Sequence, residues 1–384
     1  MTPKTKFHVA FNAMSIRPGG GLTVLLGVLD GLRSQHHLDI ELTVICSLDA
    51  TLEALEKQGI ATCHQLLKNA SGWKRQLWTI RSMGKYVDQC GADVLFSFNQ
   101  YIPKVKIPQA IYHINLTRFL PIDPSLSPPK KLIEWLRNRS SRQALKYAAA
   151  NIFESSYIQE VAETIVPATK DNYQYIYIGL PDHIANSSPA DDTSRHTVGQ
   201  ICAITNGHPH KDNETLIRHL DELIKLRPDV NWTLKIAGGL NSAMWEPYLE
   251  LAQDLGIRDR IKLIGFIDQD QLTDLLHQSL CLVSTSLVES FCMVALEAMG
   301  RGCPAVVADC TSMPESVGNA AILVQPGDPV GFAEAVLQLH DEPKDREKLI
   351  TLGYEHVKSF RWNRCGQQFA DVFSNLVELE RRET

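Results

Sequence analysis

The stretch Glu289-Ser-Phe-Cys-Met-Val-Ala-Leu-Glu-Ala-Met299 places two carboxylates around a predicted turn from a strand into a helix. Residues 282–285 are typical of the end of a buried strand, and residues 294–299 have the apolar face of a helix. A helix that begins near residues 291–293 leaves its first N–H groups unpaired and turns its positive dipole end toward the strand tips. That arrangement favours the binding of an anionic phosphate.

The two carboxylates suggest what kind of ligand carries that phosphate. Glu289 is expected in the loop beside the anion, and Glu297 lies about one helical turn further on. Hydrogen-bond acceptors on both sides of a phosphate suit a ligand with hydroxyls at both ends, such as a nucleoside diphosphate sugar. The alternative is that Glu289 caps the helix and Glu297 is a solvated helix residue, because acidic residues are common near helix starts.

Length and composition indicate a globular protein of two domains. The chain has 384 residues, of which 44% are hydrophobic. No apolar run reaches the roughly 18 residues of a membrane helix, and the polar start, residues 1–6, predicts no signal peptide. The nine cysteines are scattered without a Cys-x-x-Cys pair, which is typical of reduced thiols in a cytoplasmic protein rather than of a zinc site.

Charge is divided unevenly along the chain. Residues 1–185 contain 20 Lys and Arg against 15 Asp and Glu, a balance of +5, whereas residues 186–384 contain 18 against 29, a balance of −11. The two halves are therefore expected to face different partners. The total of −6 argues against a general nucleic-acid-binding protein.

The first half alternates between strand and helix patterns. Strands are predicted at residues 7–12, 41–46, 93–98, 109–113 and 151–154, and helices at residues 22–32, 50–58, 73–90 and 129–149. The glycine loop from Pro18 to Gly21 separates the first strand from the first helix, a pattern typical of phosphate or sugar binding. It lacks the full dinucleotide fingerprint, so no nicotinamide site is predicted.

A second alternating half follows a polar linker, which is predicted at residues 182–196. Its strands are expected at residues 198–204, 232–237, 261–264, 280–284, 305–308 and 321–324, and its helices at residues 213–226, 247–255, 270–279, 291–301, 329–339 and 345–359. An amphipathic helix is predicted at residues 363–381. The pattern predicts an α/β fold in which two parallel sheets bind ligand between their strand tips.

Residues 198–360 resemble the nucleotide-sugar domain of the family 4 retaining glycosyltransferases, which are group 1 glycosyltransferases. Besides Glu289 to Met299, the resemblance rests on six further pieces in the same order: Pro209-His210-Lys211-Asp212-Asn213, Ile236-Ala237-Gly238-Gly239, Leu263-Ile264-Gly265-Phe266-Ile267, Gly302-Cys303-Pro304-Ala305-Val306-Val307, Met313-Pro314-Glu315 and Pro326-Gly327-Asp328. The first half resembles the family more loosely, through the glycine loop, a histidine after an inner strand and Tyr177-Ile178-Gly179-Leu180.

The resemblance implies the GT-B architecture, in which two Rossmann-like domains have parallel sheets facing a central cleft. Residues 1–185 would form the acceptor-binding domain and residues 186–360 the nucleotide-sugar domain. Residues 361–384 would return to the first domain as a helix. The implied activity is sugar transfer with retention of anomeric configuration, without a metal or another cofactor, from a UDP- or GDP-linked sugar.

The resemblance also assigns roles to individual residues. Glu297 would accept hydrogen bonds from the ribose, Glu289 would hold a hydroxyl of the donor sugar, and Lys211 would neutralise the diphosphate. The remaining assignments are backbone N–H groups toward the diphosphate (Ser290, Phe291, Cys292), contacts to the base (Gly265, Phe266, Ile267) and an approach to the donor from the first domain (Gly20, Gly21). His113 is the candidate active-site histidine; the alternative is a buried histidine that bonds a backbone carbonyl.

Two positions depart from the family pattern. The family usually has an arginine just before the Pro-His-Lys region, whereas residues 203–208 here read Ala-Ile-Thr-Asn-Gly-His. His208 or His210 could replace that cation, or an arginine from elsewhere could do so. Cys292 stands where glycine is more usual, and its side chain could narrow the phosphate loop.

Two basic stretches of the first half concern the acceptor. Residues 68–85, from Lys68 to Lys85, and residues 130–146, from Lys130 to Lys146, combine basic residues with tryptophans. Such helices can lie on anionic lipid headgroups, and the alternative is a solvated face. The combined expectation is a cytoplasmic transferase, peripheral on the inner face of the membrane, that extends a surface polysaccharide such as O-antigen, capsule or lipopolysaccharide.

Other functions for this two-domain scaffold remain open on the sequence alone. A catalytically inactive protein that binds nucleotide or glycan is favoured by the missing arginine and disfavoured by Glu289, Glu297 and Lys211. A nucleotide-sugar epimerase would need no acceptor. A phosphorylase would need a lysine context for pyridoxal phosphate that the sequence does not show.

Overall fold

The chain divides into two compact units. The computed structural model describes residues 6–60, 62–98, 103–124, 126–167, 172–188, 197–239 and 241–383. One unit consists of Met1–Gly179 together with Arg361–Thr384, and the other consists of Leu180–Phe360. Much of the predicted linker, residues 189–196, lies outside the described residues. No helix in the described ranges combines the length and the apolar character needed to cross a membrane.

The first unit contains a parallel sheet of seven strands in the order β3-β2-β1-β4-β5-β6-β7. Its strands are β1 (Lys6–Asn12), β2 (Asp39–Cys46), β3 (Cys63–Gln65), β4 (Val94–Ser97), β5 (Gln109–His113), β6 (Ala150–Phe153) and β7 (Tyr173–Tyr175). The strands β3 and β7 were not predicted from the sequence. Each has three residues, and none of the six is buried, so neither strand carries the apolar run that marks an inner strand.

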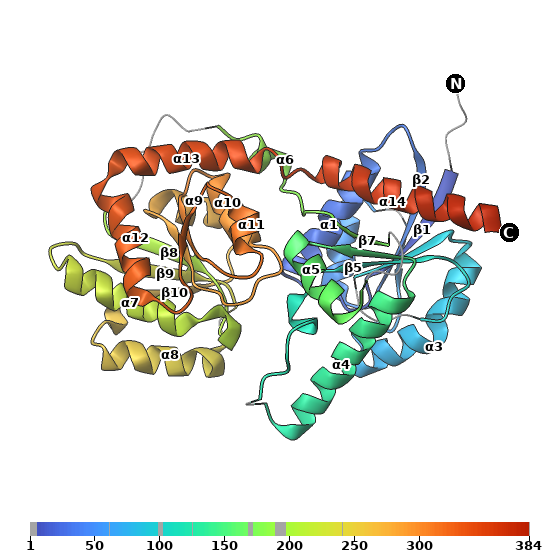
Figure 1. Cartoon of the computed structure of the whole chain (residues 1–384), viewed down its shortest axis with the longest axis horizontal. Coiled ribbons are helices and arrows are strands. Elements are labelled where there is room, and N and C mark those ends of the chain that lie inside the picture. Colours follow the sequence, from blue (N-terminus) through green and yellow to red (C-terminus); the bar gives the residue numbers. More distant parts are fainter. Residues whose placement is uncertain are drawn as a thin grey trace. The chain divides into compact units, whose positions relative to one another are not determined.

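Helices connect these strands (Figure 1). They are α1 (Gly20–Arg33), α2 (Asp49–Lys57), α3 (Gly72–Cys90), η1 (Leu116–Arg118), α4 (Pro128–Tyr147) and α5 (Ser156–Ile165). The sequence missed α5, although Ser155 caps its first turn by accepting a hydrogen bond from the Ile158 N–H at 3.2 Å. The other four long helices lie within a few residues of the predicted ranges.

The second unit contains a parallel sheet of six strands in the order β10-β9-β8-β11-β12-β13. Its strands are β8 (Gln200–Ile204), β9 (Thr233–Ala237), β10 (Ile261–Gly265), β11 (Leu282–Ser284), β12 (Ala305–Ala308) and β13 (Ile322–Val324). This is the Rossmann strand order. From β8 the following strands β9 and β10 are added on one side, and β11 to β13 are added on the other side, so the switch point of the sheet lies between β8 and β11.

The helices of the second unit are α6 (Asp182–Ala185), η3 (Pro209–Lys211), α7 (Asn213–Leu226), α8 (Ser242–Asp254), η4 (Arg258–Arg260), α9 (Gln269–Gln278), α10 (Met293–Met299), α11 (Met313–Val317), α12 (Pro329–Asp341) and α13 (Pro343–Val357). Two predictions were wrong here. Helix α8 begins at Ser242 and contains Pro247, which the prediction took for its first residue. Helix α11 was missed because it has only five residues.

The last helix, α14 (Trp362–Glu383), packs against α1 and belongs to the first unit (Figure 1). Three glycines allow the close approach: a Cβ on Gly31 would lie 2.0 Å from the Trp362 carbonyl oxygen, one on Gly27 would lie 2.0 Å from the Trp362 indole, and Gly366 lies against Gly31. Phe369 and Phe373 then pack on the Phe96 ring at 5.4 and 5.2 Å between centroids.

The start of the second unit differs from the expected boundary between residues 185 and 186. The structure divides the chain after Gly179, so α6 belongs to the second unit. Ile184 in α6 is buried, and a Cβ on Gly300 would lie 2.3 Å from its Cγ2, which shows how closely this short helix packs on the end of α10.

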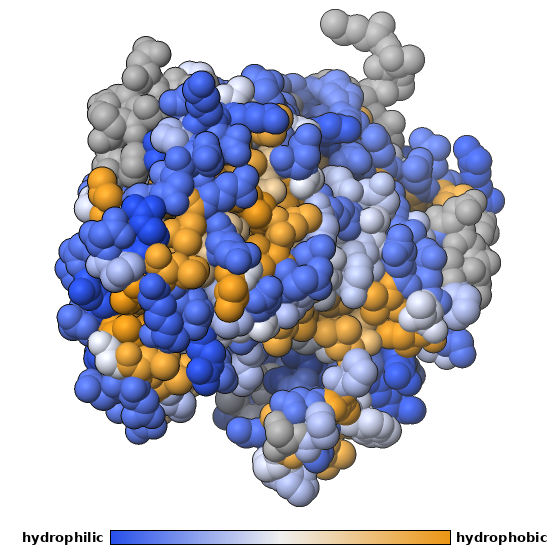
Figure 2. All heavy atoms as spheres, turned by 60° about the vertical axis from the view of Figure 1, so that its left-hand side comes forward, coloured by the Kyte–Doolittle hydropathy of each residue, from blue (hydrophilic) through white to orange (hydrophobic). Residues whose placement is uncertain are grey.

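Hydrophobic side chains are also exposed. Figure 2 shows them as small areas separated by hydrophilic side chains on one face of the molecule. In the first unit, α3 and α4 carry most of the exposed large apolar residues: Trp73, Leu77, Ile80, Leu132, Ile133, Trp135 and Leu136. These are the helices of the two predicted basic stretches.

Candidate functional site

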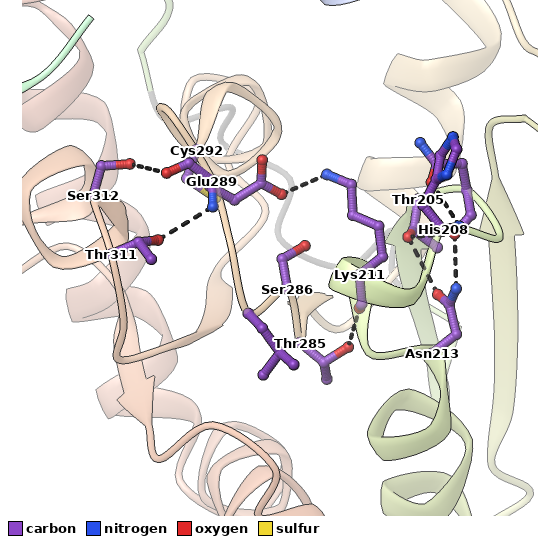
Figure 3. Close-up of polar contacts among 12 residues, drawn as sticks. Thr205, His208, Lys211, Asn213, Thr285, Ser286, Glu289, Cys292, Thr311 and Ser312 are labelled. Atoms are coloured by element: carbon purple, nitrogen blue, oxygen red, sulfur yellow. Dashed lines mark hydrogen bonds and ion pairs between the residues drawn. The ribbon is translucent and has the colours of Figure 1, made fainter. Parts of the chain in front are cut away.

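Lys211 and Glu289 meet at the carboxyl ends of two neighbouring strands. Lys211 lies in η3 after β8, and Glu289 lies in the loop after β11. The Lys211 Nζ is 2.6 Å from the Glu289 Oε1, and the side chains are only 17% and 16% exposed (Figure 3). Because β8 and β11 are the strands where the sheet order reverses, this pair occupies the usual ligand position of an open parallel sheet.

Backbone contacts between the two loops hold Lys211 in place. The Thr285 hydroxyl is within hydrogen-bond distance of the carbonyls of Lys211 and Asp212, at 3.1 and 2.9 Å, and donates to them. The Leu287 N–H donates to the His210 carbonyl at 2.8 Å. Asp212 has a φ of 47° and accepts from the Thr215 N–H at 3.3 Å, which ends η3 and caps α7.

The hydroxyls of the loop after β12 hold the Glu289 backbone. The Glu289 N–H donates to the Thr311 Oγ1 at 3.2 Å, and the Ser312 hydroxyl donates to the Glu289 carbonyl at 2.8 Å (Figure 3). With its backbone fixed on both sides, Glu289 directs its carboxylate toward Lys211. The sequence did not single out Thr285, Thr311 or Ser312, because hydroxyl residues in loops are common and their partners are distant in sequence.

Cys292 differs from its predicted role. Its backbone N–H donates to the Ser316 Oγ at 3.2 Å, so the prediction that this N–H is offered to a diphosphate was wrong. The side chain is buried, and burial raises the pKa of the thiol to about 12, with Glu289 contributing. The thiol therefore points into the protein and does not narrow a phosphate loop. Ser290 and Phe291 lie in the same short segment before α10.

Glu297 lies inside α10, as predicted. Burial raises the pKa of its carboxyl group, and the positive charge of Arg301 partly opposes that effect. Among the described residues, no hydrogen bond to its carboxylate is found, since Arg301 bonds instead to the Glu297 backbone carbonyl at 3.1 Å and to Thr273 and Gln269. A largely buried carboxylate whose oxygens make no hydrogen bond to the described residues can accept hydrogen bonds from ligand hydroxyls.

His210 does not supply the charge of the missing arginine, and it lies against His208. Their rings are stacked with centroids 5.6 Å apart and 17° between planes. Burial and then the neighbouring Lys211 lower the pKa of His210, which leaves its ring neutral at neutral pH. Lys211 therefore supplies the positive charge at these strand tips.

The predicted base-binding segment lines a cavity of about 560 Å³ within the second unit. Gly265 and Phe266 line it together with residues that follow β8 and β9: Asn206, Gly207, His208, Gly238, Gly239, Asn241 and Met244. Gly265 has a φ of 78° at a register shift in β10, and the Phe266 ring that follows is 86% exposed. Ile267 is half-buried and is not among the lining residues.

His113 ends β5 in the first unit and is fully buried. Its Nε2 lies 2.9 Å from the Asn151 Oδ1, and its ring stacks on Phe153 at 4.9 Å. Burial lowers the pKa of His113 to about 4, so the ring is neutral at neutral pH. The ring is buried, as the alternative expected, but the partner of Nε2 is a side-chain amide and not a backbone carbonyl. Its Nδ1 has no hydrogen-bond partner among the described residues, and the catalytic role of His113 stays a prediction.

The glycine loop leads into α1 of the first unit. Gly19 has a φ of 117°, and α1 begins at Gly20. A Cβ on Gly20 would meet no atom within 4 Å, and one on Gly21 would lie 3.8 Å from Ile16 and Ile114. The turn therefore requires glycine at Gly19, while Gly20 and Gly21 leave space beside the helix start. In the described ranges, no group of three or more His, Cys, Asp or Glu side chains is placed to hold a metal ion.

Comparison with protein families identifies the second unit. Residues 188–356 match the model of the glycosyl transferases group 1. This match spans most of the second unit and none of the first. The resemblance predicted from the sequence is thereby confirmed, and the Lys211–Glu289 pair lies within the matched range.

Among curated relatives, the chain is 29% identical over 174 residues to a D-inositol 3-phosphate glycosyltransferase of Corynebacterium diphtheriae. The match covers 44% of this chain and 41% of the relative, so the chain spans less than half of the relative's length.

Solved structures show the fold of the whole chain. The crystal structure of Anabaena HepE in complex with UDP-glucose has a TM-score of 0.74 at 18% identity, covering 96% of this chain and 100% of that one. The apo form of the lipopolysaccharide outer core galactosyltransferase WaaB has a TM-score of 0.67 at 16% identity and covers 96% and 99%. The predicted GT-B fold of two Rossmann-like units is confirmed.

Proposed function

We propose that this chain transfers a sugar from a nucleoside diphosphate sugar to a glycan acceptor with retention of configuration. The Lys211–Glu289 pair, at the strand reversal of a group 1 domain, is the observation that carries this proposal. A cation and a carboxylate in contact there are the two groups needed at the ends of a sugar–diphosphate bond.

The chemistry assigns a separate role to each group. Cleavage of the sugar–phosphate bond places negative charge on the leaving diphosphate and positive charge on the sugar. Lys211 stabilises the diphosphate, and Glu289, released from its ion pair, accepts a hydroxyl of the sugar. Glu297 accepts the ribose hydroxyls with its otherwise unbonded carboxylate. These residues need no metal for this electrostatic role, and retention follows from attack on the face that the diphosphate leaves.

The donor is a UDP- or GDP-linked sugar, and UDP is the first choice. Two observations support this: the cavity beside Gly265 and Phe266 has an exposed aromatic ring on which a base can stack, and the similar HepE structure is a complex with UDP-glucose. Gly20 and Gly21 of the first unit remain candidates for contact with the donor.

A thermal-shift panel with UDP, GDP, ADP and their sugar conjugates tests this proposal. We expect one nucleotide to stabilise the full chain, by roughly 2.7 kcal/mol at a hundredfold excess over its dissociation constant. Glu297→Ala should abolish the shift because the ribose loses its acceptor. Glu250→Ala, an exposed glutamate on α8, is the matched control and should keep it. No shift with any nucleotide would favour the catalytically inactive scaffold.

The acceptor is proposed to be a glycan of a surface polysaccharide, carried on a lipid at the cytoplasmic face of the membrane. Helices α3 and α4 support this, because Trp73, Ile80, Leu132 and Trp135 are exposed on helices that also carry many lysines and arginines. An exposed tryptophan on a basic helix suits the headgroup region of an anionic bilayer.

Vesicle flotation measures this membrane contact. The chain is expected to float with anionic vesicles at low salt and to be released at high salt. Lys130→Glu combined with Lys131→Glu should weaken binding roughly tenfold or more, since each basic residue contributes about 1 kcal/mol. Lys344→Glu combined with Lys348→Glu on α13 is the matched control. Equal flotation of the two double variants would contradict a role for α4.

A further inference from the structure

A second polar cavity lies entirely within the first unit. It has a volume of about 790 Å³ and lies where the sheet order reverses between β1 and β4. Its walls come from the segment after β1, the first turn of α3, the residues after β5, and α4. The cavity therefore occupies in the first unit the position that Lys211 and Glu289 occupy in the second.

Four arginines line this cavity: Arg17, Arg75, Arg118 and Arg137. No aspartate or glutamate is among its lining residues in the described part of the chain. One carboxylate behind the wall, that of Glu134, is shared by Arg118 and Arg137, the latter at 2.7 Å. Two of the four positive charges, on Arg17 and Arg75, therefore have no acidic partner among the described residues.

Arg75 is the decisive member of this group. The residue is only 4% exposed, and its buried Nε has no hydrogen-bond partner. Burial lowers the pKa of its guanidinium, and the neighbouring Arg17 lowers it further. A buried, unpaired guanidinium next to a second one is costly for the folded chain, and an anion between them would offset that cost.

The rest of the cavity suits a ligand larger than a simple ion. Helix α3 begins at Gly72, so its first N–H groups and the positive end of its dipole add to the field of the arginines. Trp73, Phe98, Ile133 and Leu136 also line the cavity and give it apolar walls. The planar guanidinium group of arginine can donate paired hydrogen bonds to phosphate oxygens, and the apolar walls can pack against a sugar ring or a hydrocarbon chain.

We propose that this cavity binds the phosphate of a phosphorylated acceptor, with Arg75 and Arg17 as its ligands and the organic part against Trp73 and Leu136. That the bound molecule is the acceptor rests on the proposed transferase activity. The phosphate can belong to a soluble sugar phosphate or to a lipid that carries its phosphate at the membrane surface, and the chemistry at the arginines is the same for both.

Binding measurements without a donor test this inference. Titration calorimetry of the full chain with inorganic phosphate, with glucose 6-phosphate and with vesicles containing phosphatidic acid compares the possible sources. All titrations are repeated on Lys211→Met, which removes the phosphate ligand of the second unit. We expect Arg75→Met to weaken phosphate binding roughly tenfold or more, as for the loss of a charge-assisted hydrogen bond, while Arg81→Met, an exposed arginine on α3, changes it less than about twofold.

Stability separates this role from a structural one. If Arg75 serves the ligand, Arg75→Met keeps or raises the melting temperature, because an unpaired buried charge is replaced by an apolar chain of similar length. Arg17→Met, at an exposed position, provides the same binding test should Arg75→Met fold poorly. Tighter binding of the sugar phosphate or of the vesicles identifies the source of the phosphate.

The inference is overturned if phosphate binding is unchanged in Arg75→Met and Arg17→Met, or if none of the three probes binds. This outcome is distinct from failure of the proposed function, which is read from the nucleotide panel and Glu297→Ala. A chain that binds UDP but no phosphate probe would keep the transferase proposal and lose the phosphorylated acceptor. A chain that binds phosphate but no nucleotide would keep the phosphate site in the first unit and lose the transferase proposal.

Discussion

Replacing Lys211 with methionine is expected to lower kcat about 10²–10³-fold, the effect commonly seen when one donor to a developing negative charge is removed. Lys211 is the one cation found within 4 Å of the Glu289 carboxylate among the described residues, and the neighbouring His210 is neutral. Under the proposed function, stabilisation of the leaving diphosphate therefore depends on Lys211.

Release of the nucleoside diphosphate from the donor sugar gives the rate for this variant. The matched control is Lys262→Met, because Lys262 is an exposed lysine of the same unit in β10 and should leave the rate unchanged. Melting temperature must be measured as well, since Lys211→Met leaves Glu289 without its ion pair. A well-folded Lys211→Met that loses less than about tenfold in kcat would contradict the role of this lysine.

The largest expected effect on stability is that of Gly31→Ala. Alanine normally stabilises a helix relative to glycine by about 1 kcal/mol. Here the new Cβ would lie 2.0 Å from the Trp362 carbonyl oxygen, so α14 would have to move away from α1. Overpacking of this kind costs about 1–3 kcal/mol, and more where buried aromatic residues such as Phe369 and Phe373 are displaced.

A pair of variants distinguishes the two contacts of Trp362. Gly27→Ala would clash with the indole, whereas Gly31→Ala would clash with the backbone of the same residue. Trp362→Ala should therefore relieve much of the cost of Gly27→Ala and little of the cost of Gly31→Ala. Urea unfolding followed by circular dichroism measures the parent, the three single variants and the two double variants, with Asp30→Ala, an exposed neighbour on α1, as control. A Gly31→Ala chain as stable as the parent would show that the helices do not pack this closely.

The sequence predicted the inner strands well because they are continuous apolar runs. The predicted ranges 109–113 and 305–308 coincide with β5 and β12, and the predicted helix 213–226 coincides with α7. Short elements at the edges of the sheet, such as β3 and β7, lack that signal. The start of α8 was predicted wrongly because proline was expected at the first position of a helix, whereas Pro247 lies within this one.

The residues of the site were predicted only in part. Lys211 and Glu289 could each be assigned to the site because each follows a strand tip in a recognisable motif, but their ion pair was not predicted. The hydroxyls that hold Glu289, those of Thr311 and Ser312, are set by tertiary contacts that no local pattern reveals. For His113 the sequence left two interpretations open, because a polar residue at a strand end is equally consistent with an exposed site and with a buried partner such as Asn151.

Helix α14 also has a consequence for synthesis of the protein. The first unit needs residues 361–384, but the ribosome makes all of residues 180–360 before it reaches them. At roughly 5–20 residues per second, that delay is on the order of 10–40 s. During this time the face of the nascent sheet that later packs against Phe369 and Phe373, including Phe96, is uncovered. The domain that is translated first is thus the one that finishes folding last.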